Sequence, residues 1–258
     1  MRAWDRFDQG VYADEVLAHM DSQDFFISVS SPEALCALPR LGHRPRLSIE
    51  GTHDLQDIMH ILPEGVQKIG LAENPLLHDL RPLAALRSLD RVGLMMCPEV
   101  GDLSPLADLG LDELYLHGVG RISGLDRLST LRYLTVSSEL PGGLRDLPHA
   151  APLTHLSLDA GVLSAGGLLS ALPALTRLGV PARAAACCPG APELPGVESL
   201  WVFDIQGTED LAPLARLCPN VRTVRLLTPL AVTLDKTAYA SDFPGVEVLT
   251  PRSRPFAF

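Results

Sequence analysis

The chain repeats one pattern of apolar and polar positions along most of its length. The pattern is apolar-x-x-apolar-x-apolar, and its strong copies start at residues 66, 89, 111, 131, 153, 175, 197 and 221. Weaker copies start at residues 24, 44 and 246, so successive copies are 20 to 25 residues apart. Such a narrow spread of spacings indicates about ten structural repeats over residues 24–251.

Each repeat predicts a short strand followed by a helical turn. The end of the pattern alternates with period two, which is typical of a strand with one buried face. A near-identical octet follows at 79–86, 102–109 and 210–217, reading DLRPLAAL, DLSPLADL and DLAPLARL. In the second octet three leucines recur at every third position, which is the period of a 3₁₀ turn. Asp102 precedes that turn and can cap its amides, and Pro105 falls early enough to cost no hydrogen bond.

One such unit cannot bury its apolar face alone, so the units must stack on one another. Stacking would align the strands into a parallel sheet and place the helical turns on the opposite side. Residues 1–23 read as an N-terminal helical cap, because Tyr12, Val16 and Met20 lie four residues apart. Residues 252–258 read as a C-terminal tail.

The repeat resembles that of leucine-rich repeat proteins, over about residues 24 to 251. It is most similar to the 22-residue bacterial, internalin-like type, in which L-x-x-L-x-L is followed by D-[IL]-x-P-L-x-x-L. It also resembles the C-terminal repeat region of actinobacterial NACHT-type NTPases. The resemblance implies an α/β leucine-rich repeat solenoid, curved, with short parallel strands on the concave face and 3₁₀ or short helical turns on the convex face.

Two departures from that family are expected to disturb the fold locally. The family places Asn at the ninth position of the unit, where it bonds backbone across coils, and here only Asn74 fits. Irregular loops are therefore expected after the strands. The segment 181–196, PARAAACCPGAPELPG, lacks the leucines of a return leg, so its coil is expected to be loose or bulged.

Composition narrows the classes of partner and compartment. The formal net charge is −10 with a pI near 5.2, which disfavours a general binder of nucleic acid or anionic membrane. No apolar run is long enough for a signal peptide or a membrane-spanning helix. The five scattered cysteines do not resemble a disulfide framework, which favours reduced thiols in a bacterial cytoplasm.

Motifs for catalysis or metal binding are weak. Gly118, Gly120 and Gly124 have nearly a dinucleotide-binding spacing, but they lie in register with the repeat and no βαβ unit surrounds them. Adjacent Cys187 and Cys188 do not have the C-x-x-C spacing of a metal site, so they read as small apolar fillers. We therefore expect no catalytic residues, no metal and no cofactor, and a protein that is not an enzyme.

The informative positions are the strand residues that alternate with the buried ones and face the concave surface. They include a basic row at the N-terminal end, a Tyr/His cluster at the centre and an aromatic pair further along. Tyr, Trp and Arg are the usual anchors of interfaces, although broad side chains also favour strands for packing reasons alone. The candidate partner-binding residues are Arg46, Lys68, Arg91, Glu113, Tyr115, His117, Tyr133, His155, Arg177, Trp201 and Phe203.

The sequence thus favours a non-catalytic sensor, adaptor or scaffold that binds a protein partner on its concave sheet. The basic row would favour an acidic segment of that partner. Two alternatives stay open, namely a small-molecule binder or enzyme that uses the Tyr/His cluster, and a self-associating structural protein. The sequence leaves the oligomeric state open.

Overall fold

The computed structural model describes residues 26–29, 46–60, 62, 65–138, 140–158, 169–188, 191–207, 209–227, 239 and 241–249. The helical cap predicted for residues 1–23 and the tail predicted for 252–258 lie outside these residues. The chain divides into two compact units, residues 1–131 and 132–258, which we describe one at a time.

The first unit is a parallel sheet whose strand order follows the chain order. Each strand pairs with the next one in register, from β1 to β5. Its strands are β1 (Phe26–Val29), β2 (Arg46–Glu50), β3 (Lys68–Ala72), β4 (Arg91–Met95) and β5 (Glu113–His117). Short helices join them, and these are α4 (Leu55–Met59), η2 (Arg81–Ala85), η3 (Ser104–Leu106) and η4 (Leu125–Arg127).

The second unit repeats this arrangement. Its strands also pair in parallel and in chain order, from β6 to β11. They are β6 (Tyr133–Ser137), β7 (His155–Leu158), β8 (Arg177–Pro181), β9 (Ser199–Phe203), β10 (Thr223–Leu226) and β11 (Glu247–Leu249). Its helices are η5 (Gly143–Asp146), η7 (Ala182–Cys187) and α5 (Ala212–Leu217).

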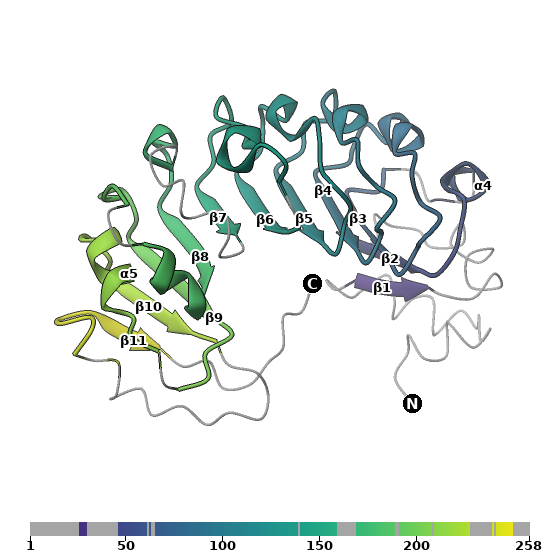
Figure 1. Ribbon diagram of the computed structural model, residues 1–258. Helices are drawn as coiled ribbons and strands as arrows, with labels where there is room; N and C mark the ends of the chain where they lie inside the picture. The colour runs from purple at the N-terminus through teal and green to yellow at the C-terminus, as the bar shows by residue number, and fades with distance from the viewer. Residues whose placement is uncertain are drawn as a thin grey trace. The chain divides into compact units, whose positions relative to one another are not determined.

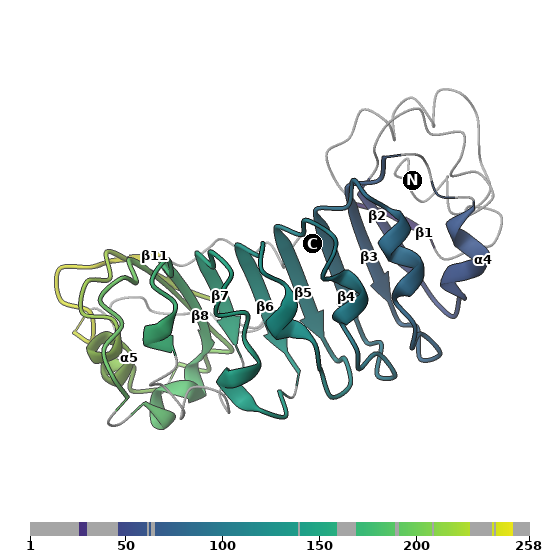
Figure 2. The same ribbon diagram turned by 90° about the horizontal axis from the view of Figure 1, so that it is seen from above.

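Within each unit the strands form one layer and the helical turns form another (Figure 1). The turns also stack along the unit, since α4 contacts η2, η2 contacts η3, and η7 contacts α5. In the first unit, Figure 2 shows α4 beside the sheet that contains β2 and β3. Both units therefore have the α/β fold of a leucine-rich repeat solenoid, as the repeat predicts.

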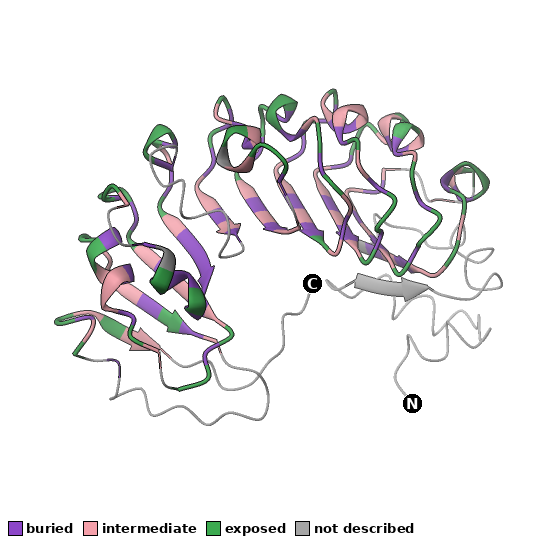
Figure 3. Cartoon of the chain, in the orientation of Figure 1, coloured by how far each residue is buried: buried purple, intermediate pink, exposed green. Residues whose placement is uncertain are grey.

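The core of each unit is built by alternate strand residues. Buried and half-buried positions alternate along most strands, and this is visible as bands in Figure 3. In the first unit the fully buried residues pair across the strands as Leu47, Ile69, Val92 and Leu114. In the second unit the matching row is Leu134, Leu156, Leu178, Leu200 and Val224.

Within each unit, the pairing of the strands confirms which described strand residues were predicted to lie side by side on one face of the sheet, in all strands but the last. The last copy of the pattern was expected to start at Val246, which would place Val248 beside Thr223. Instead Glu247 pairs with Thr223, and Val248 pairs with the buried Val224. The expectation is wrong by one residue, because Val248 rather than Leu249 continues the row of buried residues from the preceding strands.

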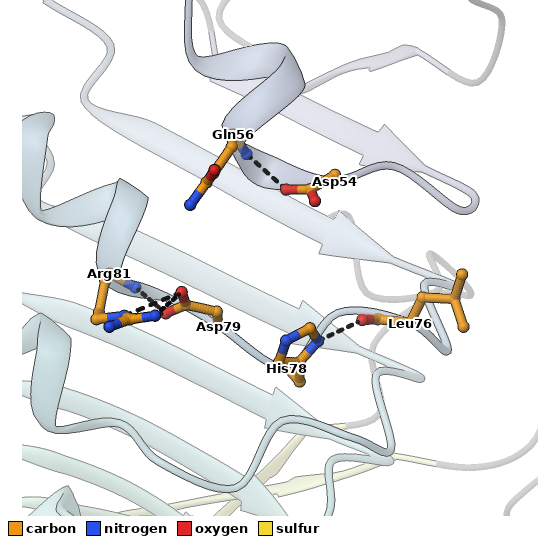
Figure 4. A network of polar contacts seen from close by, with 6 residues as sticks. All are labelled: Asp54, Gln56, Leu76, His78, Asp79 and Arg81. Carbon is orange, nitrogen blue, oxygen red and sulfur yellow. Dashed lines mark hydrogen bonds and ion pairs between the residues drawn. The ribbon is translucent and has the colours of Figure 1, made fainter.

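The aspartate of each octet bonds the first amide of its helical turn, as predicted, although the N-cap residue is the leucine that follows it. Asp79, Asp102 and Asp210 each accept a hydrogen bond from the backbone N–H two residues later, at 2.9, 2.9 and 3.0 Å. Figure 4 shows this contact for Asp79, whose carboxylate also binds the guanidinium of Arg81. Figure 4 also shows Asp54, which accepts from the backbone N–H of Gln56 at the start of α4.

The turns after five strands are regular, which contradicts the expected irregular loops. The eighth residue of the repeat has a positive φ in each, with values of 92° at Gly51, 53° at Glu73, 52° at Met96, 60° at Gly118 and 57° at Asp204. In the first three of these turns the backbone N–H of this eighth residue donates a hydrogen bond to the carbonyl of the last strand residue in the next coil. The N···O distances are 2.8 to 3.0 Å. A shared backbone conformation thus keeps these turns alike without a row of asparagines.

Contacts across coils at the ninth position use two chemistries. Asn74 is buried and donates from Nδ2 to the carbonyl of His53 in the preceding coil at 2.7 Å. Cys97 takes the same position in the next coil, and its Sγ donates to the carbonyl of Leu71 at 3.5 Å. A thiol therefore makes the coil-to-coil contact that the family usually assigns to an amide.

The coil after β8 is also better ordered than its sequence predicts. The helix η7 follows the strand directly and buries Ala182, Ala184 and Ala185. Small side chains allow this helix to lie close to the sheet without the leucines of the octets. The coil expected to be loose or bulged thus contains a helix of six residues directly after its strand.

Candidate interaction surface

The strand face is the side of the sheet that the alternate residues turn away from the core. In the first unit it carries the candidate residues Lys68, Arg91, Glu113, Tyr115 and His117, and in the second unit Tyr133, His155, Arg177, Trp201 and Phe203. All are half-buried except His117, which is exposed. Arg46 pairs with Lys68 in the sheet, but its side chain lies outside the described part of the structure.

In the first unit a polar network occupies the strand face, although the Nε of Arg91 is buried without a hydrogen-bond partner among the described residues. Arg91 and Glu113 are neighbours in register, and their side chains form an ion pair. The hydroxyl of Tyr115 donates to the second oxygen of Glu113 at 2.8 Å, and the Arg91 guanidinium lies 5.7 Å from the Tyr115 ring centre. Both charged side chains are at most 20% exposed, so the charge of Arg91 is largely compensated inside the protein.

Lys68, the other described residue of the basic row, also lies near acidic groups. Burial raises the pKa of the Asp90 carboxyl, while the positive charges of Lys68 and Arg91 lower it. The negative charges of Glu113 and Asp112 raise the pKa of Asp90. The described part of the basic row is therefore interleaved with carboxylates, which reduces its attraction for an acidic partner.

In the second unit the strand face begins with an aromatic stack. The rings of Tyr133 and His155 lie 4.1 Å apart at an angle of 21°. The Nδ1 atom of His155 is 2.8 Å from the hydroxyl of Thr154, so the neighbouring residue orients the imidazole. The two residues face each other because β6 and β7 pair them directly.

The next strands add a tryptophan with two arginines. The guanidinium carbon of Arg177 lies 5.0 Å from the centre of the Trp201 ring, and that of Arg225 lies 5.2 Å from it. Both distances are within the range of cation–π attraction. The register partner of Trp201 in β8 is Gly179, where a Cβ would lie only 2.7 Å from the hydroxyl oxygen of Ser157. Arg225 was not among the candidate residues, although it directly follows Trp201 in the register of the sheet.

This group, which we call the Arg–Trp–Arg cluster (Arg177, Trp201 and Arg225), has unsatisfied polar atoms. The Nε of Arg177 and the Nε1 of Trp201 are buried donors with no hydrogen-bond partner among the described residues. Burial lowers the pKa of Arg177, and the positive charge of Arg225 lowers it further. No described carboxylate forms an ion pair with either arginine, in contrast to Arg91.

The described cysteines are structural. Cys97, Cys188 and Cys218 are buried, and Cys188 lies near Cys218. Burial raises the pKa of Cys97, and burial together with the nearby Cys188 raises that of Cys218 to about 12. A thiol with a raised pKa is a poor nucleophile and metal ligand. Within the described residues no group of three or more His, Cys, Asp or Glu side chains comes close enough to hold a metal ion.

A shallow hollow lies on the helical side of the first unit rather than on the strand face. It is lined by Gln56, Met59, Asp79, Arg81, Pro82 and Ala85.

Of the predicted Tyr/His cluster, Tyr115 and His117 belong to the first unit, whereas Tyr133 and His155 belong to the second. No helix within the described residues is both long enough and apolar enough to cross a membrane.

No family model matches the sequence, and no curated protein matches it either. The chain is similar to the solved structure of a leucine-rich repeat protein of Leptospira interrogans, with 10% sequence identity and a TM-score of 0.35. The match covers 93% of this chain and 86% of that one.

Proposed function

We propose that this chain is a non-catalytic protein-interaction module that binds a partner protein on its strand face. The observation that supports it best is the row of Tyr133, His155 and Arg177 on the strand face of consecutive strands, with Trp201 on the same face two residues further along the next strand. The repeat constrains the buried positions but not these ones, so packing does not require such large side chains here. Tyr, Trp and Arg are also the residues that dominate the energy of known interfaces.

The backbone under this row is well suited to binding. Each strand is paired on the sheet and each described octet turn is capped, so few backbone degrees of freedom remain to be ordered. A preorganised surface loses little conformational entropy when it binds, which leaves more of the contact energy for affinity. The net charge of −10 disfavours nucleic acid and anionic membrane as partners.

We also propose a narrower assignment within this class. The three octets support the internalin-like bacterial type, and the repeat composition supports a sensor or adaptor that works beside a separate NACHT-type NTPase. The buried free thiols Cys97 and Cys218 favour the cytoplasm, where thiols stay reduced.

Affinity capture from a lysate of the source organism, followed by mass spectrometry, tests the proposal. The wild-type chain would be compared with Tyr133→Ala/Trp201→Ala, which removes two rings from the strand face. A matched control, Arg145→Ala/Arg216→Ala, changes two exposed residues of η5 and α5.

The proposal predicts a protein that the wild type and the control retain and that the strand-face variant loses. Retention of the same proteins by all three chains would place the interaction elsewhere on the molecule. If no chain retains a protein, the small-molecule and self-association alternatives are favoured instead. Circular dichroism would establish that each variant is folded.

A further inference from the structure

We propose that the Arg–Trp–Arg cluster is a binding site for an acidic segment of a partner protein, whose carboxylates pair with Arg177 and Arg225. This inference rests on the proposed function, because it names the part of the strand face that is used and the chemistry that it recognises. It differs from the expectation that the basic row of the first unit attracts the acidic segment.

The placement of the cluster follows from the register of the sheet. Trp201 lies in β9, and the two arginines come from the strands on either side of it. Strands β8 and β10 are two strand spacings apart, which is about 9.6 Å. The centre of the Trp201 ring lies 5.0 and 5.2 Å from the two guanidinium carbons, so both cations share one apolar ring.

The described residues of the surrounding sheet do not compensate the charge of the cluster. The described strand-face residues of β6 to β10 include no Asp or Glu, and Glu247 of β11 lies opposite Thr223 rather than Arg225. In the first unit, by contrast, Arg91 has Glu113 as a direct neighbour and partner. In a chain with 31 acidic and 21 basic residues, two arginines on the same face of the sheet thus have no ion-pair partner among the described residues.

The unliganded arrangement is costly in two respects that an acidic ligand would relieve. The two guanidinium groups repel each other, and this repulsion contributes to the lowered pKa of Arg177. Buried donors on Arg177 and Trp201 also lack partners. A carboxylate between the arginines would offset the repulsion and accept charge-assisted hydrogen bonds in the planar geometry that guanidinium prefers.

The same features favour a peptide over a nucleic acid. In an extended peptide, residues two apart point to the same side and lie about 7 Å from each other, a separation that two long arginine side chains can match. An Asp/Glu-x-Asp/Glu segment would therefore present two carboxylates to the two cations. A polyphosphate chain would meet repulsion from the rest of a protein with a net charge of −10.

Selection from a library of random twelve-residue peptides displayed on phage tests the site without knowledge of the natural partner. The wild type would be used for selection, and the most frequent peptide would be synthesised with a fluorescent label. Its affinity would then be measured by fluorescence anisotropy for the wild type, for Arg177→Gln/Arg225→Gln and for a control, Arg145→Gln/Arg216→Gln. The control removes the same two charges from exposed residues outside the strand face.

We expect the selected peptides to be enriched in Asp or Glu two residues apart. The Arg177→Gln/Arg225→Gln variant should bind the chosen peptide at least about tenfold more weakly, whereas the control should stay within about twofold of the wild type. Higher salt should weaken wild-type binding. The single variant Arg225→Gln, which changes an exposed side chain, gives the same test if the double variant does not fold.

Three results would overturn the site and separate its failure from that of the proposed function. Selected peptides without acidic enrichment, bound equally by the arginine variant but lost by Tyr133→Ala/Trp201→Ala, would leave a protein-binding strand face without an acidic site. Displacement of the peptide by a single-stranded oligonucleotide would replace the peptide assignment. Failure to select any peptide would remove the site, and the capture experiment alone would then decide the broader function.

Discussion

The guanidinium carbon of Arg177 lies 5.0 Å from the centre of the Trp201 ring, yet the Nε of that arginine is buried without a partner. Such a side chain gains cation–π attraction but loses the hydration of one donor and stands near the like charge of Arg225. A side chain that carries these costs adds little to stability, so it is more readily retained because it binds a partner.

Arg177→Met is therefore expected to leave the free energy of unfolding unchanged within about 0.5 kcal/mol, or to raise it. The methionine keeps the apolar part of the side chain over Trp201 and removes the charge and the unpaired donor. Urea denaturation followed by circular dichroism measures this. A loss of more than about 1.5 kcal/mol would mean that Arg177 stabilises the fold, and would weaken the case for a binding role.

The ion pair of the first unit predicts the opposite behaviour. Glu113→Gln should lower the free energy of unfolding by about 1–3 kcal/mol, because Arg91 would stay half-buried without its carboxylate. The double variant Arg91→Met/Glu113→Leu should recover most of that loss, since it removes both charges together. A double-mutant cycle with each single variant separates the pair's coupling from the effect of each side chain. Additive effects would contradict the pairing described above.

The capping carboxylate of Asp79 predicts a dependence of stability on acid pH. Hydrogen bonds from the side chain and the backbone N–H of Arg81 lower its pKa to about 2, whereas an unfolded aspartate has a pKa near 3.9. Because the folded pKa is the lower one, the stabilisation is complete above about pH 4–5 and is lost as the pH falls towards 2.

Asp79→Asn should therefore be less stable than the wild type at pH 7, by no more than about 1 kcal/mol for this solvent-screened contact. The difference should shrink between pH 4 and pH 2, and thermal unfolding at several pH values measures it. The analogous variant Asp126→Asn, at an exposed aspartate of η4 outside the three octets, is the control. A difference that stays constant down to pH 2 would rule out the carboxylate as its cause.

The left-handed turn position predicts a stabilising substitution. Met96 has a φ of 52° and is 54% exposed, so its side chain contributes little burial while its backbone is strained. Met96→Gly should raise the free energy of unfolding by up to about 1 kcal/mol, because glycine adopts positive φ without steric cost. Met95→Gly, one residue earlier within β4, should lower it and serves as the matched control. Equal effects of the two changes would contradict the turn geometry.

Much of the fold was predictable from the sequence because one periodic constraint governs it. An aliphatic residue at the alternate buried strand positions fixes the register, and the register in turn fixes which side chains share the strand face. The neighbours Arg91 and Glu113 follow from this reasoning, as does the pairing of Tyr133 with His155. The slip at β11 arose where the leucine spacing is least regular, near Val246.

Other features depend on local conformations that residue type does not reveal. Glu73, Met96 and Asp204 adopt positive φ although neither glycine nor asparagine stands there, so the regular turns were not visible in the sequence. The alanines of η7 form a helix because the neighbouring coils leave room for small side chains. Arg225 was overlooked because its importance comes from the distance to Trp201 rather than from any motif.

The most direct test of the central claim is site-specific photo-crosslinking in the source organism. A photoreactive phenylalanine analogue would replace Phe203 on the strand face in one chain and Arg216 on the exposed side of α5 in another. The account predicts a crosslinked protein from position 203 and none from position 216. A crosslink from position 216 alone would show that the partner binds the helical side and would contradict the assignment of the strand face.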